Sequence, residues 1–384
     1  MAVLATSTAL FILVESGFTV IGPLWATRDL GLDNAGWAFL RSASELGAFF
    51  SVLALGIVTE RVGSRRMSAL ALASAGLALA GMTAGVPAIW LMPILGAFLS
   101  ITYVNFNTLT QRVSSQRRSL ANAIYRAAGA GAAIAAPIAG TFAAQAFGAY
   151  TPVIRAAALV LGVGGLVILF YPEPQTSGVP KSMPQMLAAY RRCLTQRPLL
   201  VFIALSRGFG IAVAAVGAFA ALRFTRELHL SEPAFGALCS VIAIGNLLVI
   251  LASGWLVDRL RAPTVLGLAW LGCSTAALAM GLSDSLTISI VAYALYGPLF
   301  AMCSVPLSLW ASRIADDAGA DGPGEAAVFT VLKVFQTGTN MLVLALLGVL
   351  EPLVGMATLM WGGGLLGVPL ALTAMRFGVR KPVH

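Results

Sequence analysis

Apolar runs long enough to cross a bilayer, about twenty residues each, alternate with short polar segments along the whole chain. Ala, Leu, Gly and Val fill these runs, without the period-two alternation that marks the strands of membrane β-barrels. Because lipid offers no hydrogen bonds, the crossing segments must satisfy their backbone as helices. The pattern predicts an all-α membrane protein with twelve transmembrane helices. We expect these helices at residues 3–27, 36–58, 67–85, 88–110, 119–147, 149–171, 198–222, 234–257, 264–282, 286–311, 326–350 and 354–375.

Composition supports a protein that lives in the lipid bilayer. Of the 384 residues, 59% are hydrophobic and 10% are charged, whereas soluble domains have about 45–50% and 25%. The net charge of +9 does not indicate nucleic-acid binding, because the basic residues recur in short clusters between apolar runs. The first run is too long for the core of a signal peptide, so we interpret it as a retained span.

The distribution of basic residues predicts the orientation. With an even number of spans, both termini lie on one side, and the loops on that side hold sixteen Lys and Arg residues against three in the opposite loops, Arg28, Arg223 and Arg226. Basic loops face the cytoplasm. We therefore expect a multi-pass protein of the cytoplasmic membrane with both termini in the cytoplasm.

The longest loop, 172–197, is rich in proline and then basic, which is typical of a linker with a short surface helix. It would join an N-terminal six-helix bundle, 1–171, to a C-terminal one, 198–384. The four cysteines lie far apart without a C-x-x-C motif, and there are only two histidines. Neither a metal site nor a cofactor is predicted, and no nucleophile–base pair or phosphate loop indicates an enzyme.

The two bundles share an internal repeat. Residues 29–66 align with 227–264 at an offset of 198 without gaps, so that Gly47 meets Gly245 and Gly56 meets Gly254. The acid–arginine pair at 60–61 meets that at 258–259. A pattern ordered through a loop, a helix and the next loop predicts two pseudo-symmetric bundles.

The stretch "GIVTERVGSRR" (56–66) resembles the G-x-x-x-D-R-x-G-R-R signature between the second and third helices of the major facilitator superfamily. "GWLVDRLR" (254–261) resembles its second copy. This chain has Glu60 for the usual Asp, and Arg261 where Gly is expected. The resemblance covers nearly the full chain and implies a transporter of twelve helices, usually monomeric, in which this loop stabilises the outward-facing state.

The signature residues can form a conformational latch. The glycines would let helices approach closely, while the carboxylates would pair with arginine and cap a neighbouring helix. The alternative is that they are ordinary charged turn residues. The candidate latch residues are Gly56, Glu60, Arg61, Gly63, Arg65, Arg66, Gly254, Asp258 and Arg259.

Charges inside the predicted spans are functional candidates, because each costs about 2.5–3.5 kcal/mol at mid-bilayer. One face of helix 326–350 is polar: Thr330, Lys333, Gln336, Thr337 and Asn340. It would line a cavity between the halves or form an internal hydrogen-bond seam.

Two arginines lie deep in their spans. Arg207 is about 15 Å along its helix from Arg197, and Arg126 about 12 Å from Arg118. Each would face the cavity or be held by backbone carbonyls at a kink.

Two carboxylates are candidates for proton coupling. Glu15 is the only acid in the first helix, and burial lets a carboxylate take up a proton near neutrality. It could instead form a permanent ion pair with Arg126 or Arg207. Glu45 either shares the coupling role or pairs locally with Arg41 at i, i+4.

The resemblance adds candidates by position, since helices 1, 4, 7 and 10 line the cavity in the family. These are Glu15, Asn105, Arg207 and Tyr296. Helix 4 lacks the arginine common in proton–drug antiporters, and "APIAG" (136–140) only weakly matches their helix 5 motif.

We expect a secondary active transporter that works by alternating access. Arg126, Arg207 and Lys333 outnumber Glu15 and Glu45 by one, which favours an anionic or zwitterionic organic solute, with protons as the coupling ion. The first alternative is a proton-driven exporter of amphipathic drugs or metabolites. The second is a receptor or assembly factor that has a transporter fold but no transport activity.

Overall fold

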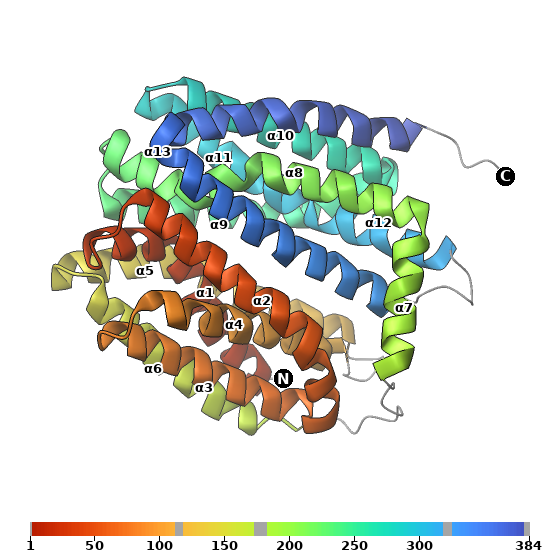
Figure 1. The fold of residues 1–384 in the computed structure, drawn as a ribbon, viewed down its shortest axis with the longest axis horizontal. Helices are drawn as coiled ribbons and strands as arrows, with labels where there is room; N and C mark the ends of the chain where they lie inside the picture. Colours follow the sequence, from red (N-terminus) through yellow and green to blue (C-terminus); the bar gives the residue numbers. More distant parts are fainter. Residues whose placement is uncertain (1, 112–117, 173–182, 318–324, 380–384) are drawn as a thin grey trace. The chain divides into compact units, whose positions relative to one another are not determined.

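The computed structural model describes residues 2–111, 118–172, 183–317 and 325–379 (Figure 1). Some helical segments, chiefly 53–61 and 118–126, are described as backbone only. The described residues form helices and no strands. In chain order the elements are α1 (Ala2–Arg28), α2 (Asn34–Val62), α3 (Ser64–Thr83), α4 (Ala88–Gln111), α5 (Arg118–Phe147), α6 (Thr151–Leu169), α7 (Met183–Thr195), α8 (Arg197–Leu222), the π-turn η2 (Arg223–Glu227), α9 (Glu232–Arg259), α10 (Ala262–Leu282), α11 (Leu286–Met302), α12 (Ser304–Asp317) and α13 (Glu325–Val379).

The predicted all-α membrane architecture is confirmed. Within the described residues, ten helical segments are long and apolar enough to cross a membrane. The last of these, in α13, reverses direction at Gly355, where φ is 78°, and so contains the two predicted helices 326–350 and 354–375. Helix α2, with 29 residues, is the remaining predicted span.

One predicted helix is interrupted. The segment expected at 286–311 forms α11 and α12, which are separated at Cys303. We predicted a bend at Gly297–Pro298, where proline removes a backbone donor. The interruption follows this proline by about one turn.

The chain divides into two compact units. Unit 1 comprises Met1–Pro180 with Ser231–Ser240, and unit 2 comprises Lys181–Leu230 with Val241–His384. In unit 1, α1 packs on α5 and α6, α2 packs on α4, and α3 lies between α4 and α6. In unit 2, α10 packs on α11 and α13, and α8 packs on α13.

The same repeat positions lie at a helix crossing in each unit. A Cβ atom on Gly47 of α2 would overlap the Pro93 carbonyl oxygen of α4. Its repeat partner, Gly245 of α9, would place a Cβ 2.9 Å from Pro298 Cγ of α11. Small residues are therefore favoured where these helix pairs meet.

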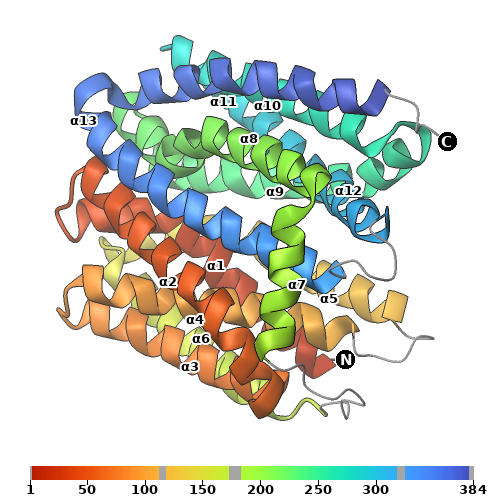
Figure 2. The ribbon, with the colours of Figure 1, turned by 45° about the vertical axis from the view of Figure 1, so that its right-hand side comes forward.

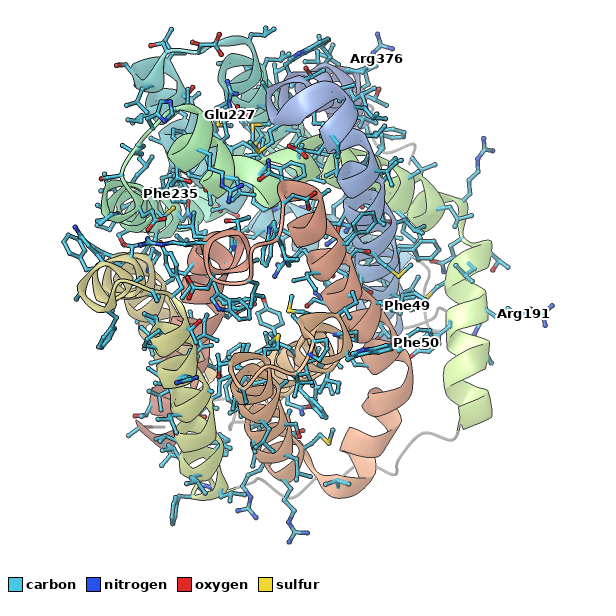
Figure 3. The ribbon with its side chains drawn as sticks, turned by 60° about the vertical axis from the view of Figure 1, so that its left-hand side comes forward. Phe49, Phe50, Arg191, Glu227, Phe235 and Arg376 are labelled. Atoms are coloured by element: carbon cyan, nitrogen blue, oxygen red, sulfur yellow. The ribbon has the colours of Figure 1, made fainter. Side chains whose placement is uncertain are left out.

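Helix α7 docks on the end of unit 2, at a steep angle to α8 (Figure 2). Its Cys193 is fully buried in a cluster with residues of α8, α12 and α13. Arg191, on the opposite side, extends away from the helix (Figure 3). All four cysteines are free and buried, as expected of apolar packing residues.

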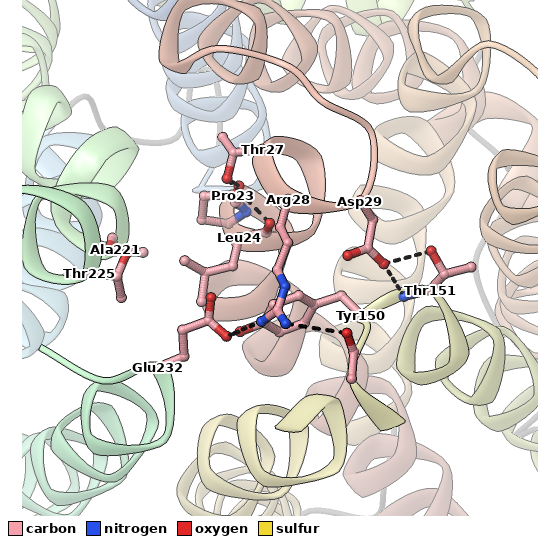
Figure 4. Close-up of polar contacts among 11 residues, drawn as sticks. Pro23, Leu24, Thr27, Arg28, Asp29, Tyr150, Thr151, Ala221, Thr225 and Glu232 are labelled. Carbon is pink, nitrogen blue, oxygen red and sulfur yellow. Dashed lines mark hydrogen bonds and ion pairs between the residues drawn. The ribbon is translucent and has the colours of Figure 1, made fainter. Parts of the chain in front are cut away.

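The end of α1 is fastened to the start of α6 (Figure 4). Asp29 Oδ2 accepts hydrogen bonds from the Thr151 backbone N–H at 2.6 Å and from its hydroxyl at 2.7 Å. Trp25 Nε1 donates to the same hydroxyl at 3.3 Å. A carboxylate at this position satisfies a free N–H group and complements the helix dipole.

Replacing Asp29 with Ala is expected to lower the free energy of unfolding by about 1–2 kcal/mol, because α6 loses its capping carboxylate. Chemical unfolding of the purified protein in detergent measures this. The matched control is Asp284→Ala, since the Asp284 side chain is fully exposed. Equal effects of the two substitutions would contradict the capping role.

Candidate functional site

The predicted binding and proton-coupling residues are distributed over both units. Glu15, Glu45, Asn105 and Arg126 belong to unit 1, whereas Arg207, Tyr296, Lys333, Gln336 and Asn340 belong to unit 2. The side chain of Arg126 lies outside the described residues.

In unit 1, α1 and α4 meet at an aromatic pair. The rings of Phe11 and Phe106 are perpendicular, with centroids 5.8 Å apart. Glu15 lies one turn beyond Phe11 on the same face of α1, and its side chain is half-buried. Asn105 is only 1% exposed, and its Nδ2 has no hydrogen-bond partner among the described residues. A buried amide donor without a partner is costly, so packing alone does not account for Asn105.

Glu45 on α2 is half-buried. It forms no ion pair with any described side chain, so the local pair with Arg41 that we considered is absent. The i, i+4 spacing brought the two residues to one side of the helix without bringing their charged groups together. A role in proton coupling stays a prediction for both Glu15 and Glu45.

In unit 2, Arg207 is a half-buried cation without a carboxylate partner among the described residues. Its one hydrogen bond there runs from Nε to Ser206 Oγ, at a long 3.4 Å. Two residues along α8, Phe209 stacks on Trp270 of α10, with ring centroids 4.6 Å apart. Because two residues rotate about 200° around a helix, Arg207 points away from α10. Among the described residues, Arg207 donates no hydrogen bond to a backbone carbonyl. The alternative that carbonyls at a kink hold this arginine therefore has no support there.

Helix α11 carries a row of aromatic rings. Tyr293, Tyr296 and Phe300 follow the spacing i, i+3, i+7 and stack nearly parallel, with centroids 6.4 Å and 5.9 Å apart. Phe224 of η2 extends the row, 5.3 Å from Tyr293. Tyr296 itself is buried. The sequence singled out the two tyrosines, and the i+4 step to Phe300 could have revealed the longer row.

The polar face of α13 is turned away from its most exposed apolar face. Thr337 is buried and donates its hydroxyl to the Lys333 carbonyl at 3.1 Å. Lys333, Gln336 and Asn340 are half-buried. The exposed Leu342 lies about 180° around the helix from Lys333. The polar face and the exposed Leu342 therefore point in opposite directions.

The first signature copy is visible in part. Gly63 adopts φ 90° and precedes α3, a conformation that glycine tolerates. Arg65 donates to the carbonyl of Tyr171, just after α6, at 3.0 Å, and Arg66 is exposed. The side chains of Glu60 and Arg61, and the surroundings of Gly56, lie outside the described residues.

The second copy differs from our expectation. A Cβ atom on Gly254 would meet nothing within 4 Å, so the predicted close helix approach at this glycine is wrong. The Arg259 guanidinium lies 3.9 Å above the Trp255 ring. Asp258 is exposed and has no ion pair among the described residues. Trp255, one helical turn before Arg259, offers that arginine a cation–π contact. The latch stays a prediction.

Arg223 was expected in an exposed loop, and this was wrong. The π-turn η2 extends α8, so Arg223 is only 3% exposed. It donates to the carbonyls of Met280 at 3.1 Å and Ser283 at 3.0 Å, and it pairs with Glu227. The guanidinium thereby supplies donors to carbonyl groups at the end of α10, so Arg223 has a structural role.

Sequence reasoning also missed a polar cluster around Glu232, at the start of α9 (Figure 4). Arg28 NH1 lies 3.0 Å from Glu232 Oε2, and the Tyr150 hydroxyl donates to the same oxygen at 2.8 Å. Arg28 also donates to the Gly148 carbonyl at 3.3 Å. Burial and the bond to Glu232 raise the pKa of Tyr150, so its hydroxyl remains a donor. An acid in the first turn of α9 was the available signal.

Residues 4–337 match the family model described as Major Facilitator Superfamily. No curated protein matches the chain. Among solved structures, the nucleoside transporter NupG is 15% identical, with 99% of both chains covered and a TM-score of 0.79. A bacterial homologue of the human lysosomal transporter Spinster is 14% identical, with 100% of this chain and 98% of that chain covered and a TM-score of 0.76. A D-xylose–proton symporter is 14% identical, with 98% and 96% covered and a TM-score of 0.74. At these identities the likeness shows the fold.

Proposed function

Because this chain belongs to the major facilitator superfamily, and is thus a multi-pass membrane transporter of small solutes rather than an enzyme, we propose that its solute is an anionic or zwitterionic organic molecule. Transport proceeds by alternating access across the cytoplasmic membrane, with both termini in the cytoplasm and with proton coupling. The transporter works as a monomer.

The observation that carries the choice of solute is Arg207. A guanidinium inside a span is costly unless an anion or a set of acceptors compensates it. Its one hydrogen bond among the described residues, to Ser206, is long. A carboxylate or phosphate on the solute would supply two short, charge-assisted hydrogen bonds. The half-buried Lys333, Gln336 and Asn340 of the same unit add hydrogen-bonding groups.

The aromatic row on α11 favours a solute that also has a flat or apolar part. Tyr293, Tyr296 and Phe300 form a row of stacked rings in unit 2, with Tyr296 buried between the other two. This row is also the observation that favours the second candidate function, export of amphipathic drugs or metabolites. The two candidates differ in charge preference, since the exporter would accept neutral and cationic lipophiles.

A thermal-shift screen on purified protein, repeated at two pH values, tests the proposal. A ligand raises apparent stability only if it prefers the folded protein. We expect carboxylates, amino acids or phosphates to raise the melting temperature. Stabilisation by cationic lipophiles alone would favour the exporter. Solutes that bind but show no flux in proteoliposomes would indicate a receptor.

Glu15 is our candidate for proton coupling, and Glu15→Gln is expected to abolish solute accumulation driven by a pH gradient. Exchange of solute for solute should persist, because the binding groups are retained. Uptake into proteoliposomes with and without an imposed pH gradient separates the two activities. Glu45→Gln is the comparison: if it alone abolished gradient-driven uptake, the assignment to Glu15 would be refuted. The D-xylose–proton symporter has the same fold, so the architecture is compatible with proton coupling.

A further inference from the structure

Two basic residues lie at similar depths in unit 2, one on α8 and one on the first part of α13. Arg207 is about 15 Å along α8 from the helix start at Arg197, and Lys333 is about 12 Å along α13 from the helix start at Glu325. Both side chains are half-buried. A charge at such a depth in a span is costly unless a counter-charge accompanies it.

The two helices pack together just before these residues. Ile203 of α8 and Leu332 of α13 belong to one buried cluster. Both helices run in the same direction from the end of unit 2 where α7 docks (Figure 1, Figure 2). Arg207 follows Ile203 by four residues, and Lys333 follows Leu332 directly. The two basic residues therefore lie on neighbouring helices, within about one helical turn in height.

In the part of unit 2 that the structure describes, no acidic residue lies at this depth. The sequence of this unit contains eight Asp and Glu residues: Glu227, Asp258, Asp284, Asp316, Asp317, Asp321, Glu325 and Glu351. Asp321 lies outside the described residues, and the others lie at helix ends, in the loop after α10 or beside the reversal of α13. Along α13, Glu325 is about two helical turns before Lys333.

The buried arginine at the end of α8 has its own compensation. Arg223 pairs with Glu227 and donates to the Met280 carbonyl at 3.1 Å. Arg207 pairs with no described carboxylate. Lys333 has contacts of its own within the protein, and its charge adds to that of Arg207 whatever hydrogen bonds it makes. The middle of unit 2 therefore carries two positive charges close together.

We infer that Arg207 and Lys333 form one site for a solute with two negative charges, a phosphate monoester or a dicarboxylate. The inference rests on the proposed anionic solute and narrows its charge. A monoanion would balance one of the two cations inside the span, whereas a dianion balances both. The guanidinium offers a planar pair of donors and the ammonium a compact charge. Such a pair of groups can bind two oxygens of one phosphate or one carboxylate each.

Ligand pairs that differ by one charge test the inference. Phenyl phosphate and phenyl sulfate have nearly the same shape, but at pH 7.5 only the phosphate is close to a dianion. Succinate and its monoamide, succinamate, are the second pair and represent dicarboxylates. Thermal-shift titration should give a dissociation constant at least about 10-fold lower for the dianion of one pair, the gain expected from a hydrogen bond to a charged group. The pair that shows this preference identifies the class of solute.

Substitutions connect the preference to the two residues. Arg207→Gln or Lys333→Gln should bring the two dissociation constants of that pair close to equality, because a single cation remains. The matched control, Arg197→Gln, removes an exposed cation from the start of α8 and should leave the preference unchanged. The wild-type comparison does not depend on whether the variants fold.

Equal affinity for the dianion and the monoanion of each pair in the wild-type protein would overturn the inference and leave the proposed anionic solute in place. Binding of monoanions or zwitterions from the screen, without binding of either dianion, would do the same. A preference that survives both Arg207→Gln and Lys333→Gln would overturn the assignment of the site. Stabilisation by cationic lipophiles alone would instead refute the proposed function, and the inference with it.

Discussion

Replacing Arg207 with Gln is expected to weaken solute binding about 10- to 100-fold, the range for a lost hydrogen bond to a charged group. Folding should be unaffected, because the guanidinium makes one long hydrogen bond among the described residues. Arg207→Lys keeps the charge but not the planar pair of donors, and should have an intermediate effect. Titration of the wild-type and variant proteins with the solute found by thermal shift measures both.

The control for this prediction is Arg155→Gln. Arg155 also lies in a span but donates to the carbonyl of Thr83, at 3.1 Å, so its removal should leave solute affinity unchanged. Lys333→Gln is expected to weaken binding in the same direction as Arg207→Gln. Unchanged affinity in both variants at position 207 would favour the exporter of neutral and cationic compounds.

Gly47→Ala is expected to be strongly destabilising. Its Cβ would overlap the Pro93 carbonyl oxygen, and a backbone atom inside a packed helix pair cannot rotate away. Overpacking costs about 1–3 kcal/mol and occasionally more, and we expect the upper end. Unfolding in detergent, together with the yield of folded protein, measures the effect.

Two further glycines serve as comparisons for Gly47. Gly245→Ala, at the equivalent repeat position, meets the ring atom Pro298 Cγ at 2.9 Å and should cost less, since a ring can shift. Gly217→Ala meets nothing within 4 Å and should stabilise α8 by about 0.5–1 kcal/mol. An equal cost at all three positions would contradict the assignment of Gly47 to a close helix crossing.

Helix positions were predictable because the bilayer imposes both a length and an apolar composition on each span. The segment expected at 88–110 forms α4, Ala88–Gln111, and that expected at 264–282 forms α10, Ala262–Leu282. Helix boundaries differ from the predicted ones where the local backbone geometry determines them. Helix α3 begins at Ser64, three residues earlier than expected, because Gly63 turns the chain sharply after α2.

Contacts between distant residues were not predictable in the same way. Arg28 and Glu232 are separated by 204 residues. Taken alone, each is a charged residue of the kind that is common in loops. Arg223 was counted with the loop residues because the π-turn that buries it has no hydrophobic period of its own. For Arg207, by contrast, depth in the span sufficed to select the residue, and the structure adds that no described carboxylate pairs with it.

Solute counterflow in proteoliposomes tests transport by alternating access most directly, because it requires no knowledge of the coupling ion. Vesicles loaded with the anionic or zwitterionic solute from the screen are diluted into trace labelled solute. The wild-type protein should accumulate label transiently, and Arg207→Gln should do so only at much higher solute concentration. Binding without counterflow in the wild-type protein would contradict the proposed cycle.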